Sequence, residues 1–187
     1  MRRGEFISRS TLIGIFCVVL ISCSAKAMTF RTQWDPDEKI NVIIGEGPIE
    51  EGDAARLEKV IPLAGRDRYG NVPLYLNSPG GSVKAALEVV EVMDREEFSA
   101  LVGSGGQCAS ACASIIYVSA RFHLVLGTGL LGIHTCYIKG QSGPPEPSSF
   151  CNEIIARNAY NHGTSYGAVQ MWQRDTGPNQ INWIGQT

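Results

Sequence analysis

Two residues with the chemistry of a catalytic pair stand where the chain is expected to leave a strand. Within residues 103–118, GSGGQCASACASIIYV, glycines turn the chain after a strand and place Ser110 at the start of an apolar helix. Within residues 130–136, LLGIHTC, His134 ends a short apolar strand. A serine hydroxyl is a weak nucleophile that becomes reactive when a neighbouring imidazole takes its proton. If the fold brings the two residues together, the sequence predicts nucleophilic catalysis.

Both residues also have an ordinary structural interpretation. A serine at the start of a helix is commonly an N-cap, which satisfies a free N–H group of the first turn. A histidine at a strand end is commonly a surface residue or a satisfied core residue. Ser104 and Ser114 are rival nucleophiles, but Ser104 lies in the turn and Ser114 lies a full turn into the helix. We therefore favour Ser110.

A third stretch, residues 74–83 (LYLNSPGGSV), ends an apolar strand with a proline and two glycines just before a helix. Pro79 withholds an N–H donor, while Gly80 and Gly81 permit positive φ and the close approach of another group. One interpretation is a tight turn between a strand and a helix. The other is a loop whose free N–H groups face something negatively charged, which would suit the chemistry of the serine and the histidine.

Strands and helices alternate along the chain, which predicts a mainly parallel α/β domain. With 187 residues, of which 44% are hydrophobic, the chain can bury one core and is expected to form one domain. We expect strands at residues 39–49, 72–77, 98–103, 122–127 and 130–134, and helices at residues 51–64, 82–96, 110–120, 148–161 and, more weakly, 168–175.

Taken together and in this order, the stretches LNSPGGSV, GQCASACASIIYV and GIH resemble the ClpP/crotonase superfamily on its serine-peptidase side, and especially its small exported relatives. The resemblance covers roughly residues 43–134. It implies an α/β fold built as a ClpP/crotonase-like spiral of ββα units in a single domain. Relatives often assemble into rings or trimers, so a homo-oligomer is also expected.

The resemblance implies roles for particular residues. Ser110 would be the nucleophile and His134 the general base, while the N–H groups of Gly81 and Ala111 would form an oxyanion hole. The third member of the triad would come from the tail: Asp175 follows the RDT-like stretch, but the register of the family's tail places Asn179 or Gln180 at the position of the acid. Residues that would shape the wall of the site are Gln107, Cys108 and Cys112.

The N-terminus has the pattern of an export signal. Residues 1–27 combine an arginine-rich start, a short apolar run and small residues, and the apolar run is too short to span a membrane comfortably. Cleavage after Ala27 would leave a mature domain of residues 28–187. The stretch LISC equally resembles a lipobox, which would leave a lipidated Cys23 and an anchor in the envelope membrane. We expect an exported protein of the bacterial periplasm or envelope.

Four cysteines lie beyond the leader: Cys108, Cys112, Cys136 and Cys151. An even number in an oxidising compartment predicts disulfides. The favoured bridge is Cys136–Cys151, which would close a segment rich in proline, glycine and serine, and a Cys108–Cys112 bridge around the serine is the further candidate. Zinc is the rival interpretation, but the histidines do not fall at zinc-site spacings with these cysteines. We expect no metal and no cofactor.

These features lead to one preferred function and two alternatives. We predict an exported ClpP-like serine hydrolase that acts on a peptide or protein substrate. The first alternative is a catalytically degenerate envelope protein that binds peptides or partners. The second is a crotonase-type acyl-CoA enzyme, which export and the serine–histidine pair both disfavour. The formal net charge of −2 and the absence of a basic run argue against nucleic-acid binding.

Overall fold

The computed structural model describes residues 27–138, 144–165, 167, 169, 176–177 and 180–185. The expected leader, residues 1–26, and much of the weaker helix expected at residues 168–175 lie outside these ranges. The strands are β1 (Thr29–Asp35), β2 (Ile40–Glu46), β3 (Val72–Asn77), β4 (Phe98–Val102), β5 (Gln107–Ala109), β6 (Phe122–Val125), β7 (Leu130–Ile133), β8 (Tyr137–Ile138), β9 (Glu146–Pro147) and β10 (Asn182–Gly185). The helices are α1 (Asp53–Val60), α2 (Val83–Glu96), α3 (Ser149–Asn161), the short 3-10 helix η1 (Ile61–Leu63) and the π-helix η2 (Cys112–Tyr117).

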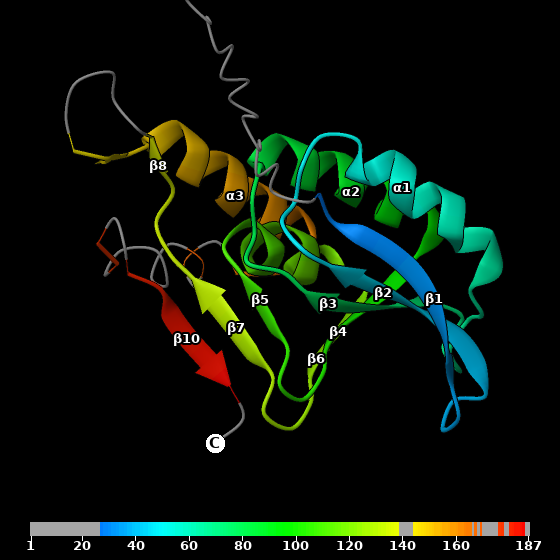
Figure 1. Cartoon of the computed structure of the whole chain (residues 1–187). Helices are drawn as coiled ribbons and strands as arrows, with labels where there is room; N and C mark the ends of the chain where they lie inside the picture. Colours follow the sequence, from blue (N-terminus) through cyan, green and yellow to red (C-terminus); the bar gives the residue numbers. More distant parts are fainter. Residues whose placement is uncertain are drawn as a thin grey trace, which may run out of the picture.

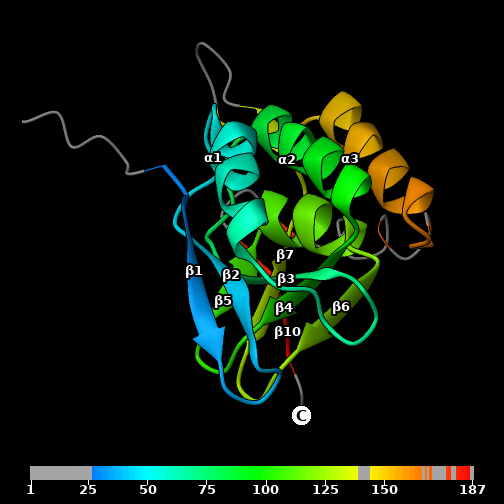
Figure 2. The ribbon, with the colours of Figure 1, turned by 90° about the vertical axis from the view of Figure 1, so that its right-hand side faces the viewer.

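Two sheets form the framework. The larger has the strand order β1-β2-β3-β4-β6, in which β2, β3, β4 and β6 are parallel and β1 is antiparallel to β2. The smaller has the order β10-β7-β5, with β5 parallel and β10 antiparallel to β7, and β8 pairs with β9 as a separate two-stranded ribbon. Helices α1, α2 and α3 lie together on one side of the larger sheet (Figure 1). Turning the molecule by 90° shows η2 beneath these helices, next to the strands (Figure 2).

Helix α2 shows how the sequence builds the core. The helix begins at an N-cap, Ser82, whose hydroxyl accepts a hydrogen bond from the N–H of Ala85. Its apolar residues recur at helical spacing, and Ala85, Ala86, Val89, Val90, Val92 and Met93 are buried. Burying each large apolar side chain stabilises the fold by about 1.5–3 kcal/mol. This face lies in the hydrophobic core, where α2 packs against α1 and η2.

The mixed α/β architecture with its mainly parallel larger sheet confirms the predicted α/β fold class. Strand β3 has the bounds expected from the sequence, while the helix expected over residues 51–64 divides into α1 and η1, because Pro62 at the start of η1 cannot continue an α-helical hydrogen-bond ladder. The helix expected at residues 110–120 is wound as a π-helix over most of its length. Among the residues described above, no helix is both long and apolar enough to span a membrane.

Candidate catalytic site

Ser110 lies at the corner between β5 and η2. Its backbone is left-handed, with φ of 55°, which is uncommon for a residue other than glycine and is found disproportionately at active sites. The Ser110 N–H donates to the carbonyl of Gly132 in β7 at 2.7 Å, and the Ser110 carbonyl accepts from the N–H and the hydroxyl of Ser114 at 2.9 and 2.8 Å. The corner is therefore held on both sides, by the smaller sheet and by the first helical turn.

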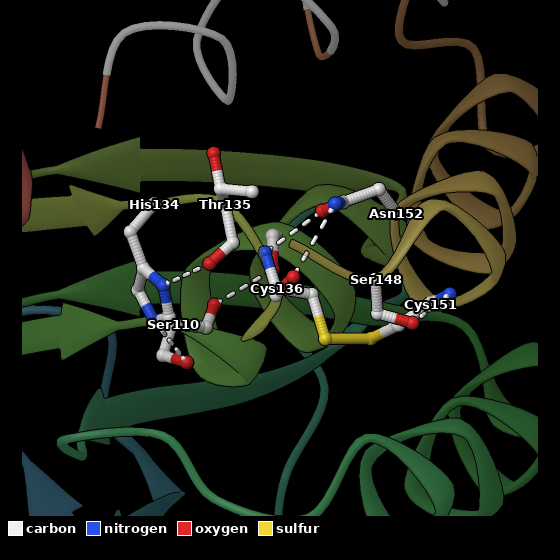
Figure 3. Close-up of a disulfide and its surroundings, with 8 residues drawn as sticks. Ser110, His134, Thr135, Cys136, Ser148, Cys151 and Asn152 are labelled. Carbon is white, nitrogen blue, oxygen red and sulfur yellow. Dashed lines mark hydrogen bonds between the residues drawn. A yellow bond between two sulfur atoms is a disulfide. The ribbon is translucent and has the colours of Figure 1, made fainter. Parts of the chain in front are cut away.

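His134 follows the end of β7 and meets the serine directly. The Nε2 atom lies 2.7 Å from Ser110 Oγ, and the Nδ1 atom lies 2.6 Å from the main-chain carbonyl oxygen of Thr135 (Figure 3). A carbonyl oxygen can only accept, so Nδ1 must carry the proton, and in the neutral ring Nε2 then accepts from the serine hydroxyl. This tautomer is the one that a general base for Ser110 requires.

The predicted third member of the triad lies outside the described residues, for Asp175 and for Asn179 alike. Gln180, which the sequence also placed at this position, accepts a hydrogen bond from the N–H of Gly177. Within the described part of the chain, the group that orients the imidazole is the Thr135 carbonyl. No residue type in the sequence could have indicated this contact, because a main-chain carbonyl is present at every residue.

Thr135 is itself held by the tail of the chain. Its N–H donates to Thr176 Oγ1 at 2.7 Å, and the Thr176 hydroxyl lies 3.1 Å from Thr135 Oγ1, where it donates. The hydroxyl of Tyr137 donates to the Thr176 carbonyl at 2.7 Å. Thr135 and Thr176 are both buried. Thr176 therefore fixes the segment that carries His134 and its carbonyl acceptor.

The two glycines of the SPGG stretch have different structural roles. Gly80, with φ of 93°, packs against the serine corner, because a Cβ there would lie 2.5 Å from Ser110 Cβ and 3.1 Å from the Ala111 nitrogen. Gly81, with φ of 153°, pairs with Ile49, whose carbonyl oxygen would lie 2.2 Å from a Cβ at Gly81.

The pairing of Gly81 with Ile49 leaves the Gly81 N–H, one of the two expected oxyanion donors, outside its hydrogen bonds. The pairing with Ile49 uses the carbonyl of Gly80 and the N–H of Ser82, each at 2.9 Å, so the Gly81 N–H takes no part in it. Ala111 begins the helical segment, where the first N–H groups have no intrahelical acceptor. The two donors that the sequence analysis selected are therefore outside the local hydrogen-bond ladders.

Two disulfides lie close to the serine and the histidine along the chain. Cys108–Cys112 spans Ser110 with a Cα–Cα distance of 5.2 Å, and Cys136–Cys151 ties the segment after His134 to α3 with a Cα–Cα distance of 6.0 Å (Figure 3). No group of three or more His, Cys, Asp or Glu side chains that could hold a metal ion is found within the described ranges.

Asn152 is a supporting residue that the sequence analysis missed. Its Oδ1 accepts from the Cys136 N–H at 2.8 Å, and its side-chain amide donates to the Cys136 carbonyl at 3.4 Å. The Ser148 N–H also donates to that carbonyl, at 2.8 Å. The start of α3 therefore holds Cys136 by hydrogen bonds as well as by the disulfide. An asparagine inside a predicted helix gives no indication of such a long-range contact.

Comparison with known proteins gives three findings. The family model described as Clp protease matches residues 35–133, just over half of the chain. The ATP-dependent Clp protease proteolytic subunit of Lactococcus lactis subsp. cremoris (strain SK11) is 34% identical over 73 residues, which are 38% of this chain and 37% of the relative. The corresponding subunit of Lactococcus lactis subsp. lactis (strain IL1403) is 37% identical over 57 residues, which are 30% of this chain and 29% of the relative. The chain thus spans about a third of the length of the relatives it matches.

A solved structure of the 1510-N membrane-bound stomatin-specific protease, in mutant form, is also similar. The TM-score is 0.57 at 15% sequence identity, and the match covers 70% of this chain and 67% of that chain. At this level of identity the likeness shows a shared fold.

Proposed function

Because the chain belongs to the Clp protease family, we propose that it is a serine peptidase in which Ser110 is the nucleophile and His134 the general base. The observation that carries the proposal is the 2.7 Å contact between Ser110 Oγ and His134 Nε2, together with the Nδ1–carbonyl contact that sets the tautomer. A structural N-cap serine has no need of an imidazole in this position.

The reaction follows from this geometry. His134 Nε2 takes the hydroxyl proton as Ser110 Oγ attacks the substrate carbonyl, and the Gly81 and Ala111 N–H groups bind the oxyanion that develops. His134 then gives the proton to the leaving amine, so that an acyl-enzyme forms on Ser110. Water, activated by the same imidazole, releases the acid product. Each oxyanion donor is worth about 2.7–4 kcal/mol of barrier in enzymes where one has been removed.

The imidazolium formed in this cycle needs an acceptor at Nδ1. The Thr135 carbonyl supplies one, and it stabilises the cation less than a carboxylate would, because it carries only a partial charge. We propose Asp175, with Asn179 as the alternative, as the tail residue that adds to this support.

The proposal extends to the location and state of the protein. Two disulfides favour an oxidising compartment, in line with an export signal in residues 1–27, and a lipid anchor at Cys23 is the alternative processing product. The substrate class is a peptide or protein, and we propose a homo-oligomeric assembly.

The test is labelling of the oxidised protein with a fluorophosphonate probe, read as a second-order rate. Ser110→Ala should abolish labelling, and His134→Ala should reduce it by about 10²–10⁴-fold, the usual contribution of a general base. Ser104→Ala is the matched control, because Ser104 is an exposed serine in the preceding turn and should label like the wild type. Equal labelling of the wild type and Ser110→Ala refutes the proposal. A folded wild type that does not label supports the non-catalytic peptide-binding alternative.

A further inference from the structure

The Cys108–Cys112 disulfide joins the residues on either side of Ser110, the proposed nucleophile. Cys108 lies in β5, two residues before Ser110, and Cys112 begins η2, two residues after it. Both cysteines are 0% exposed and belong to the hydrophobic core. The disulfide therefore joins the strand to the helix across the corner that carries the catalytic hydroxyl.

Apart from the packing of Gly80 against both sides, the main-chain hydrogen bonds of the corner each belong to one side of it. On the strand side, the Ala109 N–H donates to the Ser78 carbonyl at 2.9 Å and the Ser110 N–H donates to the Gly132 carbonyl at 2.7 Å. On the helix side, the Ser110 carbonyl accepts from the N–H and the hydroxyl of Ser114. These hydrogen bonds hold the strand in its sheet and the helix in its first turn. Beyond the main chain itself, the disulfide is the covalent cross-link between the two sides.

The backbone of the corner has an unfavourable conformation that a cross-link would help to hold. Ser110 has φ of 55°, and the helix that follows is wound as a π-helix. For a residue with a Cβ, left-handed backbone persists only where the surroundings over-determine it. Without the disulfide, only non-covalent contacts oppose a rewinding of residues 110–113 toward ordinary α-helical geometry. That change would carry Ser110 Oγ away from His134 Nε2 and change the direction of the Ala111 N–H.

We infer that the Cys108–Cys112 disulfide is a positioning element for Ser110, so that the hydrolase is competent only in its oxidised form. The inference rests on the proposed function. Its consequence is control by compartment: the chain is inactive while its thiols are reduced during synthesis and becomes active after transfer to an oxidising compartment.

Activation is the oxidation of the Cys108 and Cys112 thiols to a disulfide, and it requires a disulfide oxidant. The two thiols of Cys108 and Cys112 lose two electrons and two protons as the sulfur–sulfur bond forms, and the oxidant's disulfide is reduced to two thiols. A dithiol reductant reverses the reaction. Oxidised glutathione and dithiothreitol serve as the two reagents in the test.

The second disulfide provides a matched comparison within the same chain. Cys136 is held by Asn152 and Ser148 hydrogen bonds that do not depend on its sulfur, so the segment after His134 keeps anchors when Cys136–Cys151 is removed. The experiment uses the full mature chain with two double variants, Cys108→Ala/Cys112→Ala and Cys136→Ala/Cys151→Ala. Fluorophosphonate labelling rates are measured well below the thermal midpoint of each variant.

We expect Cys108→Ala/Cys112→Ala to label at least 30-fold more slowly than the wild type while remaining folded. We expect Cys136→Ala/Cys151→Ala to lose no more than about threefold. In this second variant, dithiothreitol should lower the rate as far as the first double substitution does, and oxidised glutathione should restore it. The pH profile of labelling should flatten when Cys108–Cys112 is absent, because the coupling of Ser110 to His134 is lost, and a purely stabilising disulfide would leave that profile unchanged.

Two results overturn the inference. One is a folded Cys108→Ala/Cys112→Ala variant that labels at the wild-type rate with the wild-type pH profile. The other is an unchanged ¹⁵N shift of His134 Nε2 when Cys108–Cys112 is removed, which can be measured even if the oxidised wild type does not label and the proposed function is thereby refuted separately. The imidazole ¹⁵N shifts of His134 then decide: the inference stands if removing Cys108–Cys112 shifts the Nε2 resonance as much as Ser110→Ala does, and it falls if the resonance is unchanged.

Discussion

Gly80→Ala tests whether the glycine corner is built for the approach of Ser110. Gly80 is buried and has φ of 93°. An added Cβ would lie 2.5 Å from Ser110 Cβ, 2.6 Å from the Ala109 carbonyl oxygen and 3.1 Å from the Ala111 nitrogen. Two of these atoms are backbone and the third is the Cβ of Ser110, so none can move without moving the corner.

The expected loss in the free energy of unfolding of Gly80→Ala has two parts. Left-handed backbone costs an alanine roughly 1–2 kcal/mol relative to glycine, and forcing an extra methyl group into a packed site adds typically about 1–3 kcal/mol. We expect Gly80→Ala to lower the free energy of unfolding by about 2–5 kcal/mol. Where the corner yields instead of the fold, a shift of Ser110 by about 1 Å should slow labelling by about 10²-fold.

The assay combines urea unfolding with fluorophosphonate labelling, and Gly70→Ala provides the control. Gly70 has φ of 86°, close to that of Gly80, but nothing lies within 4 Å of the position its Cβ would take. Gly70→Ala should therefore show the backbone cost of about 1–2 kcal/mol and label like the wild type. If Gly80→Ala matches Gly70→Ala in both stability and labelling rate, the conclusion that Gly80 must be a glycine to let the serine corner approach is refuted.

Three further predictions concern other parts of the chain. Thr176→Val should cost about 1–3 kcal/mol in urea unfolding and slow labelling, because it leaves the buried Thr135 N–H without its acceptor, whereas Thr176→Ser should keep both. Asp53→Ala should cost about 1–3 kcal/mol, because the buried carboxylate accepts from the Glu50 N–H and from Arg56; an unchanged urea midpoint contradicts this. Burial raises the pKa of Tyr117 to about 12 from 10.0, so its contribution to stability is present below pH 10 and is lost between pH 10 and 12; Tyr117→Phe should flatten that loss, and equal slopes would refute it.

The parts of the fold that the sequence predicted are those determined by local pattern. β3 and α2 follow from an apolar run, a glycine corner and helical spacing, which need no knowledge of distant residues. β1 and β10 were not predicted. β10 is largely exposed and exists because it pairs with β7, a contact between residues about 50 positions apart. Such strands are set by their partner and leave little periodic signal of their own.

The residues of the candidate site likewise divide into those that local sequence pattern predicts and those that long-range contacts determine. Ser110, His134 and the glycines could be selected because their residue types and spacing carry chemistry. The supporting groups Thr135, Thr176 and Asn152 could not, since they act through main-chain atoms and through contacts across 16 to 41 positions. Hydrogen bonds to the main chain constrain the partner's position and leave no trace in the partner's residue type.

Gly132 shows why the serine–histidine distance depends on the whole smaller sheet. Gly132 pairs with Ala109 on one side and with Trp183 on the other, and its carbonyl accepts from the Ser110 N–H. A Cβ at Gly132 would lie 2.7 Å from Ile181 Cγ2, 2.8 Å from Trp183 Cζ3 and 3.0 Å from Ala109 Cβ. A side chain there would push β10 and β5 away from β7.

Since Ser110 follows β5 and His134 follows β7, their separation is fixed by the register of these two parallel strands. A slip of one residue would move the imidazole by about 3.3 Å along the strand, which is more than the 2.7 Å contact can absorb. The glycine at position 132 lets β10 approach β7 closely, and the pairing of β7 with β10 and β5 keeps Ser110 and His134 in register. The contact between Ser110 and His134 is therefore a property of strand pairing as much as of the two side chains that meet.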